Sequence, residues 1–130
     1  MKLFISIGTN DIGFDARDVR GIYNNIVSIV EEVQERSKNT EIFIVSVIPV
    51  NATVADYINR DYVDSRDNFD INMLNFYLHN YTKKSKLKFI DASNALKNNY
   101  DTLNLKYTLD GFHLNDEGLK LISGMILQQI

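Results

Sequence analysis

Three side chains in this sequence have the chemistry of a hydrolytic site: an amide, a carboxylate and an imidazole. Asn10 carries an amide N–H that can donate a hydrogen bond to a developing oxyanion. Asp110 and His113 are three residues apart, so that the carboxylate can hold one imidazole nitrogen and leave the other free as a general base. Each of these residues also suits an ordinary turn, because Asn-Asp and Asp-Gly are common turn dipeptides. The other histidine, His79, has no acidic neighbour at a useful spacing, and we assign it a structural role.

Apolar runs and helical periodicities predict the elements that must position these side chains. The nearly continuous apolar runs Lys2–Ile7 and Glu41–Ile48 are typical of strands buried on both faces, and Leu87–Ile90 is a third, shorter candidate. Asp15 or Asp18 is the expected cap of the first helix. Apolar residues recur at helical spacing over residues 19–33, 74–81, 92–96 and 114–130. This alternation of strands and helices predicts an α/β fold with a parallel sheet.

The candidate residues stand where such a fold gathers its functional groups. In open parallel sheets these groups lie at the carboxyl ends of the strands, and Gly8–Asp11 follows the first strand directly. Asp110–His113 comes just before the last helix, for which Asn115 or Asp116 is the expected cap. The long polar stretch Asn51–Asp70 predicts a loop with at most a short turn, in a position to form part of a pocket wall.

Two motifs and their order resemble one enzyme family. The segment Ile5–Ile12 is similar to the third motif block of the SGNH or GDSL-like hydrolases, whose core is G-x-N-D, and Asp110–Asn115 is similar to the fifth, D-x-x-H followed by a helix. The V-x-P-V sequence that ends at Val50 lies between them, as in the branch resembling platelet-activating-factor acetylhydrolase. The resemblance covers essentially the whole chain. It implies a flavodoxin-like three-layer α/β/α fold, a single domain over residues 1–130 and a Ser-His-Asp ester hydrolase.

The resemblance also implies a role for each matching residue. Asn10 corresponds to the oxyanion donor, His113 to the general base and Asp110 to the acid that orients the histidine. Gly8 would allow the close turn at the end of the strand, and Asp11 would brace the loop. This chemistry requires no metal and no other cofactor, and the scattered Asp residues show no ligand spacing.

The motif that supplies the nucleophile in this family, G-D-S, is missing from the sequence. None of the eight serines follows Gly-Asp: Ser6, Ser28, Ser37, Ser46, Ser65, Ser85, Ser93 and Ser123. We expect Ser93 to cap a helix instead. The chain would begin at the family's third strand, which predicts a sheet truncated to three strands with Lys2–Ile7 at its edge. We therefore expect no esterase activity from this polypeptide alone.

Composition excludes several other functions. The 130 residues, 45% hydrophobic and 24% charged, suit one globular domain. A net charge of −3 without a basic stripe argues against a nucleic-acid partner, and the absence of Cys excludes disulfides and thiolate metal sites. No apolar run is long enough to span a membrane and no signal-peptide core is evident, so we expect a cytoplasmic protein with no membrane partner.

The sequence leaves three hypotheses open. In the first, the chain is a shortened esterase for small acyl esters, or for acetyl groups on carbohydrate or lipid, which needs a G-D-S segment for completion. Alternatively, it is a non-catalytic interaction or structural module that forms a homodimer through Lys2–Ile7. In the third hypothesis it is one half of a split enzyme, and another polypeptide supplies the serine.

Overall fold

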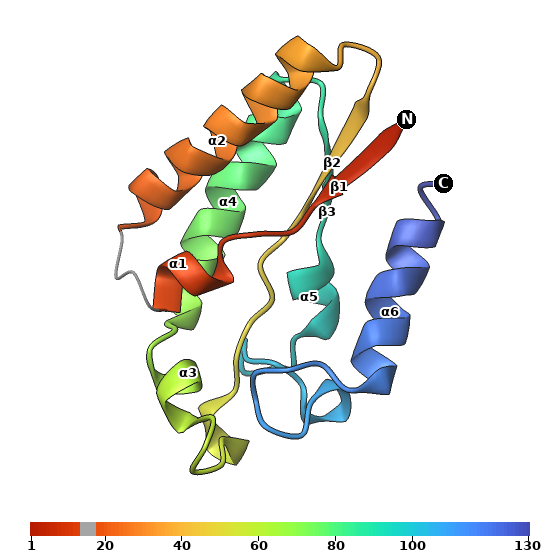
Figure 1. The fold of residues 1–130 in the computed structure, drawn as a ribbon. Coiled ribbons are helices and arrows are strands. Elements are labelled where there is room, and N and C mark those ends of the chain that lie inside the picture. The colour runs from red at the N-terminus through yellow and green to blue at the C-terminus, as the bar shows by residue number, and fades with distance from the viewer. Residues whose placement is uncertain (14–17) are drawn as a thin grey trace.

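The centre of the molecule is a small parallel sheet (Figure 1). The computed structural model of the protein describes residues 1–13 and 18–130. Within these residues the strands are β1 (Lys2–Ile5), β2 (Glu41–Val45) and β3 (Lys88–Ile90), in the order β1-β2-β3 with both pairs parallel. β1 and β3 are therefore the edges, as the sequence predicts for β1. The first two strands end earlier than the apolar runs that predict them.

Helices cover both faces of the sheet, so the fold is the expected three-layer α/β/α arrangement. The long helices α2 (Val19–Arg36) and α4 (Asn68–Lys84) lie together on one face, and α5 (Ala92–Leu96) and α6 (Asp116–Leu127) lie on the other (Figure 1). The α2–α4 layer encloses the larger apolar core, whose fully buried members include Ile22, Val30, Ile71 and Leu74. On the opposite face the buried core is smaller: Phe43, Val45, Ile90 and Ala92.

Helix caps agree with the sequence at two of the three predicted positions. Asp18 caps α2, since its carboxylate accepts hydrogen bonds from the backbone N–H groups of Arg20 and Gly21. The alternative cap, Asp15, lies outside the described residues. Asn115 is the cap of α6, so that the choice left open between Asn115 and Asp116 is resolved in favour of the asparagine.

The prediction that Ser93 caps a helix is wrong. Asp91 occupies the N-cap of α5 and accepts a hydrogen bond from the backbone N–H of Asn94. Ser93 lies inside the first turn, where its own backbone N–H donates to the Ser46 hydroxyl at 2.7 Å. The carboxylate therefore takes the capping position, and both serines are buried in the interior.

The polar stretch predicted as a loop is more structured than expected. It contains a 3₁₀ turn, η1 (Ala52–Val54), and a short helix, α3 (Arg60–Asp64), before α4 begins at Asn68. The two other short elements are α1 (Thr9–Gly13), directly after β1, and η2 (Leu105–Tyr107), before α6. All four lie beyond the carboxyl ends of the strands, or in the turns that lead back from there (Figure 1).

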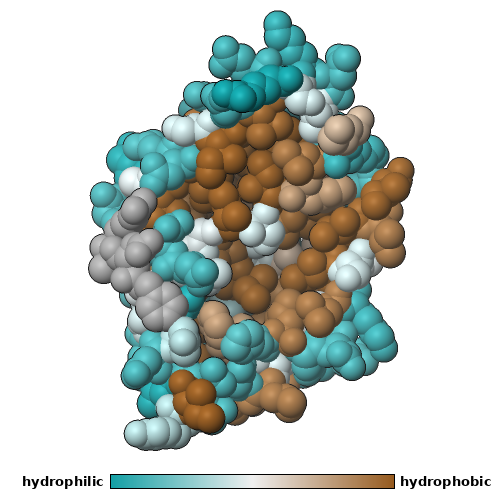
Figure 2. All heavy atoms as spheres, viewed as in Figure 1, coloured by the Kyte–Doolittle hydropathy of each residue, from teal (hydrophilic) through white to brown (hydrophobic). Residues whose placement is uncertain are grey.

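One face of the molecule is broadly apolar (Figure 2). The apolar surface extends over β1 and across the space between α2 and α6. Ile7, two residues after β1, is 42% exposed and Leu119 on α6 is 54% exposed. Gly118 is the only buried residue of α6, so the large apolar side chains of this helix are all partly or fully exposed. No helix in the described ranges combines the length and the apolar character needed to cross a bilayer.

Candidate active site

Asp110 and His113 form the hydrogen-bonded pair that their spacing predicts. Nδ1 of His113 lies 2.7 Å from Oδ2 of Asp110. The other carboxylate oxygen accepts hydrogen bonds from the backbone N–H groups of Phe112 and His113, both at 2.8 Å. The side chain of Asp110 is 17% exposed and that of His113 is 66% exposed. A fixed carboxylate thus holds one imidazole nitrogen, while the ring itself remains accessible to solvent.

The electrostatics of this pair favour an ionised acid beside a protonated Nδ1. Burial raises the pKa of the Asp110 carboxyl, but hydrogen bonds from the His113 ring and from the backbone N–H groups of Phe112 and His113 outweigh it. The pKa of Asp110 consequently lies below its ordinary value. A carboxylate in this position keeps the proton on Nδ1, so that Nε2 presents its lone pair as a general base.

Two polar residues that sequence reasoning missed hold this pair in place. The Thr108 hydroxyl donates to the backbone carbonyl of His113 at 2.6 Å and accepts from the Gly111 N–H at 3.0 Å. The Asn59 amide donates to Oδ2 of Asp110 at 3.2 Å. Thr108 lies only two residues before Asp110, and Asn59 comes from the stretch predicted as a loop. The sequence contains no signal for the contact between Asn59 and Asp110, because it joins residues 51 positions apart.

Gly111 lets the Asp110–His113 segment approach the chain beyond β2. Its φ is +82°, and a Cβ at this position would lie 1.9 Å from the carbonyl oxygen of Asn51. The Asn51 N–H donates to the Gly111 carbonyl at 2.8 Å across the same contact. Only glycine combines this backbone conformation with so close an approach.

Asn10 lies in α1, and the oxygen of its side-chain amide is fixed by a hydrogen bond. Oδ1 of Asn10 accepts a hydrogen bond from Nη2 of Arg66 at 3.0 Å. The preceding turn uses Gly8, whose φ is +120° and where a Cβ would lie 3.2 Å from Leu74. The bracing role predicted for Asp11 stays a prediction, since its carboxylate makes no hydrogen bond within residues 1–13 and 18–130.

A common cavity brings the two candidate segments together. Thr9, next to Asn10, and His113 line one cavity of about 340 Å³. The remaining lining residues are apolar: Ile48, Val50, Phe112, Leu114 and Leu119. His113 and the neighbour of Asn10, from opposite ends of the chain, therefore face one largely apolar space at the carboxyl edge of the sheet.

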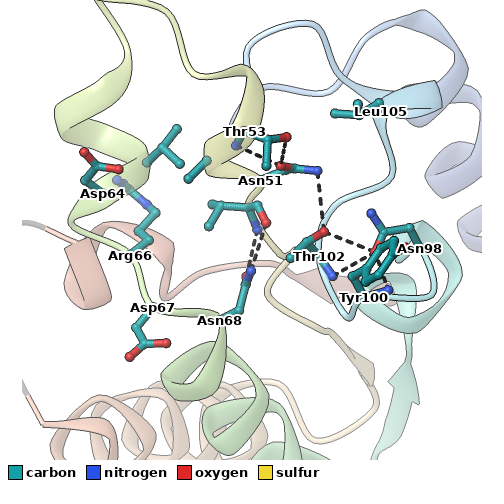
Figure 3. Close-up of a pocket in the computed structure, with 13 residues that line it drawn as sticks. Asn51, Thr53, Asp64, Arg66, Asp67, Asn68, Asn98, Tyr100, Thr102 and Leu105 are labelled. Atoms are coloured by element: carbon teal, nitrogen blue, oxygen red, sulfur yellow. Dashed lines mark hydrogen bonds between the residues drawn. The ribbon is translucent and has the colours of Figure 1, made fainter.

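A second, larger cavity of about 730 Å³ lies beside it (Figure 3). Residues of the stretch predicted as a loop form much of its wall, although Tyr57 and Tyr62 of this stretch are not among the lining residues. Most of the amides at this wall are bonded within the protein. Asn68 pairs with both backbone groups of Val50 at 2.9 Å (Figure 3). Asn51 donates to the Leu103 carbonyl at 2.9 Å. These amides therefore fix the wall of the cavity.

No serine in the described part of the chain hydrogen-bonds to His113. Ser46 and Ser93 are buried in the interior, and Ser6 directly follows β1. His79, assigned to a structural role, stacks on Phe89 with ring centroids 4.6 Å apart. The site thus contains a candidate base, its orienting acid and a candidate oxyanion donor.

A parallel α/β sheet with an Asp-His pair at its carboxyl edge places the protein among the three-layer α/β hydrolase-like proteins. The profile of the GDSL-like lipase/acylhydrolase family matches residues 2–121 of the sequence. The chain belongs to this family, as its two motifs predict.

The chain is also similar to one curated protein of another described activity and to solved structures, one of them a GDSL-like lipase. A curated relative is the N-acylneuraminate cytidylyltransferase of Escherichia coli O18:K1:H7, 29% identical over 97% of this chain. A structure from Streptococcus pneumonia, provisionally described as a platelet activating factor, superposes with a TM-score of 0.86 at 29% identity over 98% of this chain. A GDSL-like lipase from Bacteroides thetaiotaomicron superposes with a TM-score of 0.80 at 26% identity over 97%.

These relatives are all longer than the matched region. The chain spans 27% of the Escherichia coli protein, 58% of the Streptococcus pneumonia chain and 60% of the Bacteroides chain. The matched region therefore corresponds to part of each relative.

Proposed function

We propose that this chain supplies the acid–base and oxyanion half of a serine ester hydrolase that acts on small acyl esters. The observation that carries the proposal is the Asp110–His113 pair, with 2.7 Å between Oδ2 and Nδ1 and an exposed imidazole. The family of GDSL-like lipases and acylhydrolases, to which the chain belongs, provides the reaction class. In this proposal the serine hydroxyl comes from a G-D-S segment outside these 130 residues.

The proposed mechanism is two-step acyl transfer. Nε2 of His113 accepts the proton of the serine hydroxyl as its oxygen attacks the acyl carbon, and the Asp110 carboxylate stabilises the imidazolium. The Asn10 amide donates to the oxyanion. The tetrahedral intermediate collapses, and His113 gives the proton to the departing alcohol. Water then attacks the acyl-serine in the same way and releases the acid and the free serine.

The cavity at the site supports a small acyl group as substrate. Its volume is about 340 Å³, and its lining between Thr9 and His113 is apolar. A short hydrocarbon chain would replace water there favourably. The description of the Bacteroides thetaiotaomicron structure as a GDSL-like lipase suits the same substrate class, esters with an acyl group.

In this proposal the serine segment pairs with the exposed side of β1. One side of β1 pairs with β2, and the other has no strand partner within the described residues. A strand added there would end beside Gly8, at the same edge of the sheet as the candidate site. The exposed apolar surface over β1 and α6 would be covered by the helix that follows this strand (Figure 2).

The experiment is a comparison of the chain alone with a chimera. The chimera joins the part of the Bacteroides thetaiotaomicron lipase that this chain does not match, which the proposal requires to carry the G-D-S segment, to the present 130 residues. We expect no turnover of p-nitrophenyl acetate by the chain above that of its His113→Ala variant. We expect turnover by the chimera that falls at least about a thousandfold in His113→Ala.

His79→Ala is the matched control, because it removes the other histidine and should leave the rate of the chimera unchanged. A folded chimera whose rate does not depend on His113 would contradict the proposal. So would turnover by the unmodified chain that exceeds that of its own His113→Ala variant.

A second candidate function is a non-catalytic module that dimerises through β1. The same unpaired strand edge and the same exposed Ile7 and Leu119 favour it. The two candidates differ in what His113 does: replacement of His113 has no consequence for a structural dimer, whereas it abolishes the turnover of a completed esterase.

A further inference from the structure

Arg66 is a buried cation that contacts the oxyanion candidate directly. It follows α3, and only 4% of its surface is exposed. Nη2 donates to Oδ1 of Asn10 and Nε donates to the Thr9 hydroxyl, both at 3.0 Å. Nη1 donates to the Tyr62 carbonyl within its own segment. The rigid fork of the guanidinium thus binds two neighbouring residues of α1 and anchors them to α3.

The charge of Arg66 determines which way the Asn10 amide points. A guanidinium has donors and no acceptor, so the amide must turn its oxygen toward Arg66. Its NH2 group then points away from Arg66, and Nδ2 makes no hydrogen bond within the described residues. With the opposite orientation, two sets of N–H donors would face each other at 3.0 Å. The amide N–H groups are thereby kept available for an acceptor outside the protein.

We propose that Arg66 is the positioning residue that fixes the Asn10 amide with its N–H donors toward the oxyanion. This inference rests on the proposed role of Asn10 in the ester hydrolase. Arg66 acts through Asn10 and touches no reacting atom. Its hydrogen bond also polarises the amide, because an amide whose oxygen accepts from a cation becomes a stronger N–H donor.

Arg66 also contacts the segment that carries the base. Its guanidinium lies over the ring of Phe112, 4.4 Å from the ring centroid. Phe112 packs edge-on against the His113 ring, with centroids 4.5 Å apart. One side chain therefore touches the residue before the base and the oxyanion donor, which lie more than 100 positions apart in the sequence. Such a bridge holds the distance between the two functional groups.

The environment of Arg66 strengthens these contacts. Burial lowers the pKa of the guanidinium from its ordinary value. A desolvated cation interacts more strongly with its acceptors than an exposed one, since less water competes for its donors. Displacement of Arg66 is therefore expected to release the Asn10 side chain.

Nuclear magnetic resonance of the ¹⁵N-labelled chain tests this directly. The side-chain NH2 signals of Asn10, identified by their loss in Asn10→Asp, report its order through the heteronuclear NOE. We expect a value in the parent close to that of the backbone. In Arg66→Met it should fall to the level of the exposed side chains of Asn94 and Asn99, with backbone signals of the three strands unchanged. Arg60→Met is the matched control, because Arg60 donates to the Ala55 carbonyl and makes no contact with Asn10.

A second variant displaces Arg66 without removing it. A Cβ at Gly13 would lie 2.8 Å from Cζ and Nη1 of Arg66, so Gly13→Ala should push the guanidinium away from Asn10 and lower the same NOE. Gly124→Ala is its control, since a Cβ there has nothing within 4 Å. Gly13→Ala decides the question if Arg66→Met does not fold.

An Asn10 amide that stays ordered when Arg66 is removed or displaced would overturn the inference, even if the melting temperature falls, because Arg66 would then only join α1 to α3. An Asn10 amide already mobile in the parent would overturn it as well. Neither of these two NMR results depends on ester turnover. A failure of the proposed esterase function therefore remains distinguishable from a failure of this inference.

Discussion

At the scale of single residues, the ionised carboxylate of Asp110 links stability to the candidate chemistry. Folding lowers its pKa below the ordinary value. An acid whose pKa is lowered on folding stabilises the folded state above its unfolded pKa of about 3.9, and this stabilisation is lost as the pH falls through the folded value. The hydrogen bonds that orient His113 for catalysis thus also contribute to the free energy of unfolding at neutral pH.

Asp110→Asn should remove this pH-dependent contribution. We expect it to lower the free energy of unfolding at pH 7 by roughly 1.5–3 kcal/mol, the range for hydrogen bonds to a charged group. The difference from the parent should shrink between pH 5 and pH 2, measured by urea unfolding at each pH. Asp11→Asn is the matched control, because the Asp11 carboxylate has no hydrogen bond among the described residues. A constant difference between parent and Asp110→Asn over this range would contradict the assignment.

At the scale of elements, asparagine side chains of α4 bond the backbone beyond the end of β2, where no strand of the described chain pairs with it. β2 ends at Val45, and the Ser46 N–H makes the last backbone hydrogen bond to β3, with the Ile90 carbonyl at 3.0 Å, before the chain continues to Val50 without a strand partner among the described residues. Asn75 on α4 accepts from the Val47 N–H and donates to the Val47 carbonyl, both at 2.8 Å. Asn68, the first residue of α4, makes the same pair of bonds with Val50. The helix thereby holds the segment that leads from β2 to the candidate site.

Asn75→Leu should therefore be strongly destabilising. It leaves the buried N–H and carbonyl of Val47 without their partner, and each such group costs about 1–3 kcal/mol. We expect a total loss of roughly 2–5 kcal/mol in the free energy of unfolding, measured by denaturant titration. Asn80→Leu, on the same helix but without a side-chain hydrogen bond to the described residues, should cost less than about 0.5 kcal/mol. Equal losses in the two variants would show that α4 does not hold this segment.

These contacts show why some features are predictable from the sequence and others are not. The strands and long helices follow from local apolar patterns, and the Asp110–His113 pair follows from a spacing of three residues. The end of β2 does not follow from such a pattern, because the apolar run continues beyond Val45 and its backbone is bonded to asparagines of a helix. The contact of Asn10 with Arg66 joins residues 56 positions apart, and an arginine in a polar stretch carries no sign of burial.

At the scale of the whole molecule, the sheet is unevenly covered. The α2–α4 layer buries its apolar side chains, whereas α6 buries only Gly118, and β1 has no strand on its outer side within the described residues (Figures 1 and 2). Exposed apolar area beside an unpaired strand edge favours association with another polypeptide. The partner in the leading proposal is the serine segment, and in its absence a second copy of the chain can take the same surface.

The isolated chain is therefore expected to self-associate, with a mass in light scattering above the 15.0 kDa of the monomer. Ile7→Asp and Leu119→Asp place a charge on the surface over β1 and α6 and should each shift the mass toward 15.0 kDa, because a carboxylate would have to be desolvated in the contact. Ile58→Asp is the control: Ile58 is 78% exposed and lies between η1 and α3, away from β1. A monodisperse parent monomer would rule out association through β1, and equal dissociation by Ile58→Asp would place the contact elsewhere.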